Sequence, residues 1–89
     1  MSVYVDRNRA KLGRMVMCHM LADTRAELHA MAERLGLRRE WFQDCPPSSA
    51  PHYDISLTKR AAALRLGAID ADRHLLVEVI KRARAAGWP

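Results

Sequence analysis

Residues 15–27, with the sequence MVMCHMLADTRAE, decide the fold because they place a strand directly before a helix. The run from Met15 to Leu21 is apolar except for His19, and its length favours a buried strand, with a helix as the main alternative. Thr24 and Glu27 then form a T-x-x-E capping box, which is typical of a helix start. A strand that leads into a helix in this way indicates an α/β fold.

The helix that follows the capping box is amphipathic. Its apolar residues recur at the spacing of one helical face, and Gly36 is placed to end it. The residues on this face are Leu28, Met31, Ala32 and Leu35.

Further strands and loops are predicted on both sides of this unit. The β-branched and aromatic residues 3–5 predict a strand that ends at Asp6, and residues 7–14 predict a polar loop. Residues 41–43 are compatible with a short strand. Residues 44–51 contain three prolines and two serines, so they predict a loop.

Two more helices are expected in the second half of the chain. Ser56 can cap one of them, which Gly67 ends, and residues 68–69 can form a brief strand after it. Either Asp70 or Asp72 can cap the last helix. Because strands alternate with helices, we expect one domain over residues 1–89, with a small, largely parallel sheet of three or four short strands covered by about three helices.

Composition limits the classes of protein that the chain can belong to. Hydrophobic residues make up 49% and charged residues 28% of the 89 residues, which indicates a globular chain. The two cysteines are too few for a disulfide scaffold, and no apolar run is long enough to cross a membrane, so we expect a cytoplasmic protein with free thiols and no membrane partner. The net charge of +5 makes an anionic partner plausible, and the short chain leaves a homodimer open.

The sequence resembles a bacterial and phage family known as domain of unknown function 4031. The resemblance covers most of the chain and rests on the stretches VYVD (3–6), HMLADT (19–24), ELHAMAERLGL (27–37), HYD (52–54) and LGA (66–68). The family pattern runs almost directly from Phe-Gln into His-Tyr-Asp, whereas this chain carries residues 44–51 between them. The resemblance implies a shared fold and a shared set of polar residues, and it implies no particular reaction.

The tripeptide His52-Tyr53-Asp54 is the strongest candidate for a functional site. In an extended segment alternate side chains share a side, so His52 and Asp54 are expected to lie together and Tyr53 to face away. An imidazole beside a carboxylate can serve as a general acid and base. The structural alternative has Tyr53 packed in the core and Asp54 holding a turn.

Three further residues are candidates for the same site. His19 interrupts an apolar strand and needs a polar partner, which Asp6 or Asp54 can supply; a satisfied core histidine is the alternative. Asp6 and Asp23 follow predicted strands and would lie at one edge of the sheet if those strands are parallel. Turn formation and helix capping are the respective alternatives for these two carboxylates.

A cluster of cations predicts an anion site next to these residues. Guanidinium groups and the backbone of a glycine-containing loop can hold a phosphate, although a solvated basic loop is the alternative and no P-loop motif is present. Lys59 in a first helical turn also favours an anion nearby. We therefore expect the ligand-binding residues to be Arg7, Arg9, Lys11, Arg14, Asp23, Tyr53 and Lys59, and the catalytic residues to be His52, Asp54, His19 and Asp6.

These residues allow several functions. The first is a site for a phosphate-bearing small molecule such as a nucleotide; the second is a hydrolase-like enzyme, with metal assistance as an option, that uses His and Asp as acid and base. The third is a basic accessory module that binds nucleic acid or protein, although no nucleic-acid-binding motif is present. No H-E-x-x-H or paired-cysteine spacing occurs, so the sequence assigns no residue to a metal and names no cofactor.

Overall fold

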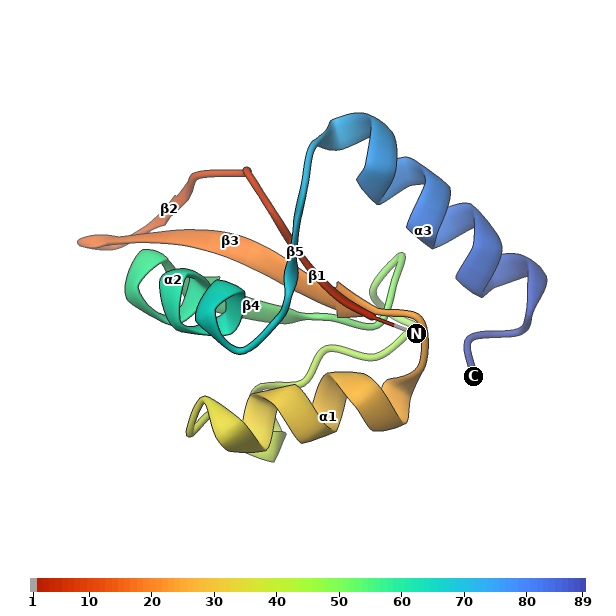
Figure 1. The fold of residues 1–89 in the computed structure, drawn as a ribbon, viewed down its shortest axis with the longest axis horizontal. Coiled ribbons are helices and arrows are strands. Elements are labelled where there is room, and N and C mark those ends of the chain that lie inside the picture. The colour runs from red at the N-terminus through yellow and green to blue at the C-terminus, as the bar shows by residue number, and fades with distance from the viewer. Residues whose placement is uncertain (1) are drawn as a thin grey trace.

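The computed structural model describes residues 2–89, which form three α-helices, one short 3-10 helix and five strands (Figure 1). In chain order the elements are β1 (Val3–Asp6), β2 (Ala10–Leu12), β3 (Met15–Ala22), α1 (Arg25–Arg34), η1 (Arg39–Trp41), β4 (Tyr53–Ser56), α2 (Leu57–Arg65), β5 (Ile69–Ala71) and α3 (Arg73–Ala85).

Strand β3 is the centre of the sheet. Met20 of β3 pairs with both Val5 and Tyr53, so β1 and β4 lie on opposite edges of β3. Met17 of β3 likewise pairs with one residue of β2 and one of β4, so β2 continues along the edge that β1 occupies. β5 lies outside β1.

The α/β class is confirmed, but the expectation of a largely parallel sheet is wrong. The sheet is mixed, and its only parallel pair among the described residues is β1 with β5. The chain reverses at Gly13, whose φ of 62° suits a tight turn, and so β3 returns antiparallel to the segment before it.

Two local predictions are also wrong. The polar loop predicted over residues 7–14 contains β2, because a short edge strand that pairs through its backbone needs no apolar pattern. The strand predicted over residues 41–43 is absent: η1 ends at Trp41, and Gln43 makes a single antiparallel bridge to His52.

Side-chain caps fix the starts of all three helices as predicted. The backbone N–H of Glu27 donates to the Thr24 hydroxyl at 3.2 Å, which completes the expected cap of α1. The Ser56 hydroxyl caps α2 in the same way. Asp72, rather than Asp70, caps α3 through a bond of 2.8 Å from the N–H of Leu75.

The two faces of the sheet are covered differently. Helices α1 and α2 cover the face that carries Val5, Cys18, Met20, Tyr53 and Ile55, all buried. Helix α3 packs on the opposite face over β1 and β5 (Figure 1). It leaves the middle of β3 and β4 less covered, so His19 and Asp54 stay half-exposed there.

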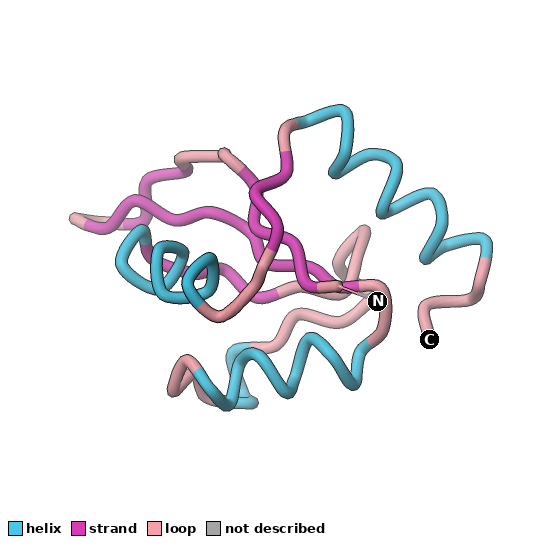
Figure 2. Tube along the Cα trace, in the orientation of Figure 1, coloured by secondary structure: helices cyan, strands magenta, loops and turns pink. Residues whose placement is uncertain are grey.

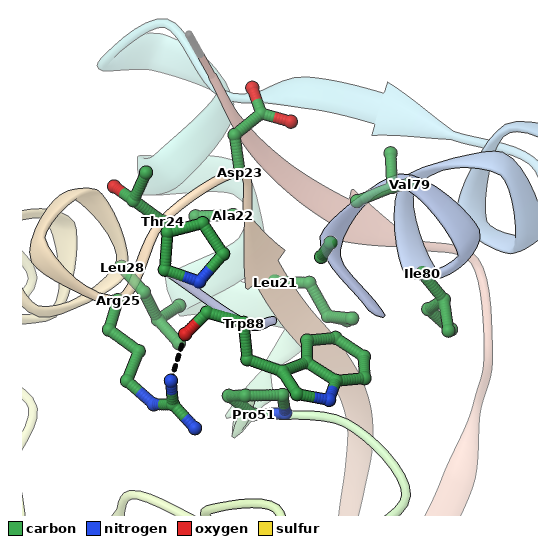
Figure 3. Close-up of a pocket in the computed structure, with 12 residues that line it drawn as sticks. Leu21, Ala22, Asp23, Thr24, Arg25, Leu28, Pro51, Val79, Ile80 and Trp88 are labelled. Atoms are coloured by element: carbon green, nitrogen blue, oxygen red, sulfur yellow. Dashed lines mark hydrogen bonds between the residues drawn. The ribbon is translucent and has the colours of Figure 1, made fainter. Parts of the chain in front are cut away.

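A long irregular segment joins η1 to β4 (Figure 2), and the C-terminal residues hold its far end in place. The Trp88 indole lies beside the buried Pro51, and the Arg25 guanidinium donates to the Trp88 carbonyl (Figure 3). Arg25 also binds Asp44 at 2.7 Å. These contacts fix the backbone that leads into His52.

Among residues 2–89, the helices all lack the length and apolar character that a membrane span requires.

Candidate metal centre

Four polar side chains from neighbouring strands meet on the less covered face of the sheet. Asp6 ends β1, His19 lies in the middle of β3, and Asp54 lies on β4 with His52 just before that strand. His19 and Asp54 are register partners, so their side chains share a face. Tyr53 points to the opposite face and is only 1% exposed.

Asp6 orients His19. The His19 Nδ1 lies 2.7 Å from the Asp6 Oδ2, and the backbone N–H of His19 donates to the Asp6 Oδ1 at 2.8 Å. The N–H of Asn8 also donates to that oxygen, at 3.2 Å. A carboxylate held at both oxygens fixes the imidazole ring and leaves its Nε2 facing outward.

The backbone orients His52 in a comparable way. Its Nδ1 lies 2.7 Å from the carbonyl oxygen of Ala50, which can only accept, so this nitrogen carries the proton. The Ser48 hydroxyl lies 3.2 Å from the same nitrogen. In the neutral ring the Nε2 of His52 therefore has a free lone pair.

Both Nε2 atoms face one oxygen of Asp54. The Asp54 Oδ1 lies 3.6 Å from the Nε2 of His19 and 3.4 Å from the Nε2 of His52. The other oxygen, Oδ2, accepts a hydrogen bond of 2.6 Å from the Gln43 amide. The two rings meet edge to face, with centroids 5.2 Å apart.

The electrostatics favour an ionised Asp6. Burial opposes its charge, but hydrogen bonds from the side chain and backbone of His19 outweigh burial and lower the pKa of Asp6 below its usual value. The hydrogen bond to Asp6 likewise raises the pKa of His19, against the opposing effect of burial. Asp6 thus supplies negative charge behind the His19 ring.

The two separations at Asp54 suit the ligands of a tetrahedral metal ion. Ligands about 2.0–2.1 Å from zinc are roughly 3.3–3.4 Å apart, which is close to the two separations at Asp54. A charge-assisted hydrogen bond would be shorter, at about 2.7–2.9 Å. One ligand atom from each of His19, His52 and Asp54 lies within 4.8 Å of the other two, so the three can hold one cation.

Two other predicted site residues lie outside this cluster. Asp23 was expected beside Asp6 on a parallel edge, but β1 and β3 are antiparallel, so the two residues lie at opposite ends. Asp23 instead accepts from the backbone N–H of Ser2 and the hydroxyl of Tyr4. The hydroxyl of Tyr53 lies 2.9 Å from the Nδ1 of His29, away from the cluster.

Two of the predicted cations are bound to other groups of the protein. Arg7 binds Asp70 at 3.0 Å, and Lys59 donates to the carbonyl of Leu35 at 2.7 Å. Lys11 pairs with a residue whose side chain faces away from the His19 side of β3. The other two cations, Arg9 and Arg14, are exposed on either side of β2.

The sequence did not indicate the groups that hold Asp54 and His52 in place. Gln43 and the Ala50 carbonyl act through contacts to Asp54 and His52 across the irregular segment. A backbone carbonyl leaves no mark in a sequence, and the single bridge of Gln43 to His52 has no local pattern.

The fold and this cluster define a small α/β domain with a two-histidine, one-carboxylate site. A family model described as "Protein of unknown function (DUF4031)" matches residues 3–83. The chain belongs to this family, in agreement with the resemblance found in the sequence. No curated protein and no solved structure matches the chain.

Proposed function

We propose that this protein is a small hydrolase-like enzyme whose centre is a divalent metal ion bound by His19, His52 and Asp54. The observation that carries the proposal is the convergence of two imidazole Nε2 atoms on one Asp54 oxygen, at 3.6 and 3.4 Å. The Nδ1 atom of each ring is already held by an acceptor. That arrangement is typical of metal-binding histidines, whose second nitrogen bonds to a carboxylate or carbonyl.

The ligand set suits zinc or another borderline transition metal. Imidazole with one carboxylate is an established ligand combination for catalytic zinc, and three protein ligands leave a position open for water or substrate. A metal ion in such a site lowers the pKa of water and polarises an ester oxygen.

Hydrolysis would then proceed with water as the only co-reactant. The oxygen of water bonds to the carbon or phosphorus of an ester, the bond to the leaving oxygen breaks, and that oxygen takes a proton from the water. Asp6 holds the His19 ring in place, while Gln43 holds Asp54. The net charge of +5 favours an anionic substrate, so phosphate-bearing small molecules are the first class to test.

Titration of the metal-free protein with Zn²⁺ and Co²⁺ tests the proposal. We expect one ion per chain by calorimetry and a visible Co²⁺ spectrum typical of a low coordination number. The substitutions His19→Gln, His52→Gln and Asp54→Asn should each weaken binding by more than the roughly 10–100-fold that loss of an outer partner costs. His74→Gln, which changes an exposed histidine of α3, is the matched control.

The titration tests the metal centre, and incubation of the zinc-loaded protein with phosphate and carboxylic esters tests the enzymatic part of the proposal. Unchanged affinity in the three ligand variants would overturn the metal centre. Binding of one ion without hydrolysis of any phosphate or carboxylic ester would overturn the enzymatic part and leave a metal-binding module.

A basic nucleic-acid module is the second candidate, favoured by the exposed cations Arg9, Lys11 and Arg14 around β2. Phosphate contacts make binding strongly dependent on salt. Fluorescence anisotropy with a short duplex at low and high salt tests this candidate, and the absence of binding at low salt would reject it.

A further inference from the structure

A groove adjoins the candidate metal centre along the outer edge of β4. It has a volume of about 510 Å³, which lies within the usual range for small-molecule sites. Its lining comes from β3, β4, the segment around η1 and the start of α2. Asp54 and Gln43 belong both to this groove and to the metal centre, so the two are continuous.

The groove is chemically apolar. Its apolar lining consists of Met15, Met17, Leu37, Trp41 and Ile55. Met15 and Trp41 are 52% and 50% exposed, the largest fractions among the exposed large hydrophobic residues that the structure describes, and both line this one groove. A flat indole beside flexible thioethers is a surface that adapts to aromatic or branched apolar groups.

The polar side chains of the groove are turned toward the protein itself. The Gln43 amide donates to Asp54, the Ser56 hydroxyl accepts the N–H of Lys59 in the cap of α2, and the Lys59 ammonium donates to the Leu35 carbonyl. A ligand in the groove thus meets mainly carbon and sulfur, except at the end where Asp54 lies. The lining of the groove is therefore suited to an apolar group, and the polar end at Asp54 is suited to the group that reacts.

We propose that the groove binds an apolar group of the substrate, of aromatic size. This group is joined through the ester oxygen to the carbon or phosphorus atom that lies at the metal centre, beside Asp54, and the bond between that oxygen and that atom is the one hydrolysed. This inference rests on the proposed metal centre and adds the substrate class. It favours aryl or bulky alkyl esters over nucleotides, whose bases would leave their hydrogen-bonding edges unpaired in such a groove.

Equilibrium binding of non-hydrolysable ligands to the zinc-loaded protein separates this inference from the catalytic proposal. Benzylphosphonate is compared with methylphosphonate, and phenylacetate with acetate, so that the two pairs distinguish phosphate from carboxylic ester chemistry. We expect the aryl member of at least one pair to bind about tenfold or more tightly, as apolar pockets discriminate between groups of different size. Trp41→Ala and Met15→Ser should remove this preference and leave Zn²⁺ affinity unchanged.

Val77→Ala is the matched control, because Val77 is an exposed apolar residue of α3 outside the groove. Equal affinity for aryl and methyl ligands, or an aryl preference that survives Trp41→Ala, would overturn the groove inference while metal binding stands. A concentration-dependent dimer that Trp41→Ala abolishes would also overturn it, since a second copy of the chain would then occupy the groove. If metal binding fails, the same ligand pairs on the metal-free protein still show whether the groove prefers aryl groups.

Discussion

The Nδ1 of His19 lies 2.7 Å from the Oδ2 of Asp6, although the two residues are 13 positions apart in the chain. The tight turn between β2 and β3 folds the chain back and brings them together, because β1 and β3 are antiparallel neighbours. The charged side chain of Asp6 is only 4% exposed, so its position depends on the bonds that it accepts from His19. The pair therefore links the topology of the sheet to the chemistry of the site.

Asp6→Asn should weaken Zn²⁺ binding by roughly 10–100-fold, the usual cost of losing an outer partner of a metal-binding histidine. The amide has one acceptor oxygen where the carboxylate uses two, so it cannot accept from both the Nδ1 and the backbone N–H of His19. It also lacks the charge that makes the imidazole a better ligand. Calorimetric titration of the variant measures this loss. Asp70→Asn, which removes a carboxylate bound to Arg7, serves as control and should bind zinc as the wild type does. Equal affinities in both variants would contradict a role for Asp6.

Gln43→Leu should lower zinc affinity by roughly tenfold, at the lower end of the range for outer partners. The Gln43 amide holds the Oδ2 of Asp54 at 2.6 Å, and without it the carboxylate can rotate away from the histidines. Asp54→Asn should have a much larger effect, because it changes the ligand itself. Calorimetric titration of both variants compares their zinc affinities. A Gln43→Leu protein that binds zinc more weakly than Asp54→Asn would refute the assignment of Asp54 as the ligand and Gln43 as the residue that positions it.

The sequence predicted much of the fold where local chemistry determines structure. The caps at Thr24 and Ser56 and the apolar face of α1 need only neighbouring residues, and all are present. Strand β2 was missed because its pairing depends on β3 and not on its own pattern. The prediction that the strands are largely parallel was wrong, because the direction of β3 depends on the turn at Gly13.

The candidate site was predictable to a similar degree. Alternation along an extended segment places His52 and Asp54 together, and the need of His19 for a polar partner points to Asp6 and Asp54. The grouping of Asp23 with Asp6 failed because it assumed parallel strands. The anion site predicted from the basic loop of residues 7–14 stays a prediction, but one of its cations, Arg7, is paired with Asp70, a residue 63 positions away that no local pattern points to.

The two cysteines should differ sharply in reactivity. Burial raises the pKa of the Cys18 thiol to about 11, and its sulfur lies 3.5 Å from the carbonyl oxygen of Ile55. Since the thiolate is the reactive form, iodoacetamide at about pH 8 should modify the partly exposed Cys45 and leave Cys18 unmodified. Mass spectrometry of tryptic peptides measures both sites. Both should react in denaturant, and equal rates in the native protein would show that Cys18 is accessible.

The burial of His29 should make stability depend on pH. Burial, followed by the charge of Arg39, lowers the pKa of His29 below its usual value of 6.5, so the folded state favours the neutral ring. A group with a lowered pKa contributes stability above its unfolded pKa and loses it as pH falls through the folded pKa. The free energy of unfolding should therefore fall on acidification below 6.5 less steeply in His29→Gln than in the wild type. Urea unfolding across this window measures the difference; His74→Gln should keep the wild-type slope.

Trp88 should support the proposed metal centre from a distance. Its indole lies beside Pro51, directly before His52, and the Trp88 carbonyl is held by Arg25 (Figure 3). Trp88→Ala should lower the free energy of unfolding by about 1–3 kcal/mol, less than a fully buried tryptophan because the side chain is partly exposed.

The same change should also reduce zinc affinity, because the backbone that carries the Ala50 carbonyl would no longer fix the His52 ring. Met31→Ala, on α1 and in the core of the other face, provides a control of comparable instability. Zinc titration at a temperature where both variants are folded separates the two effects. If Met31→Ala lowers zinc affinity as much as Trp88→Ala does, general destabilisation explains the loss and the C-terminal contact has no specific role in positioning His52.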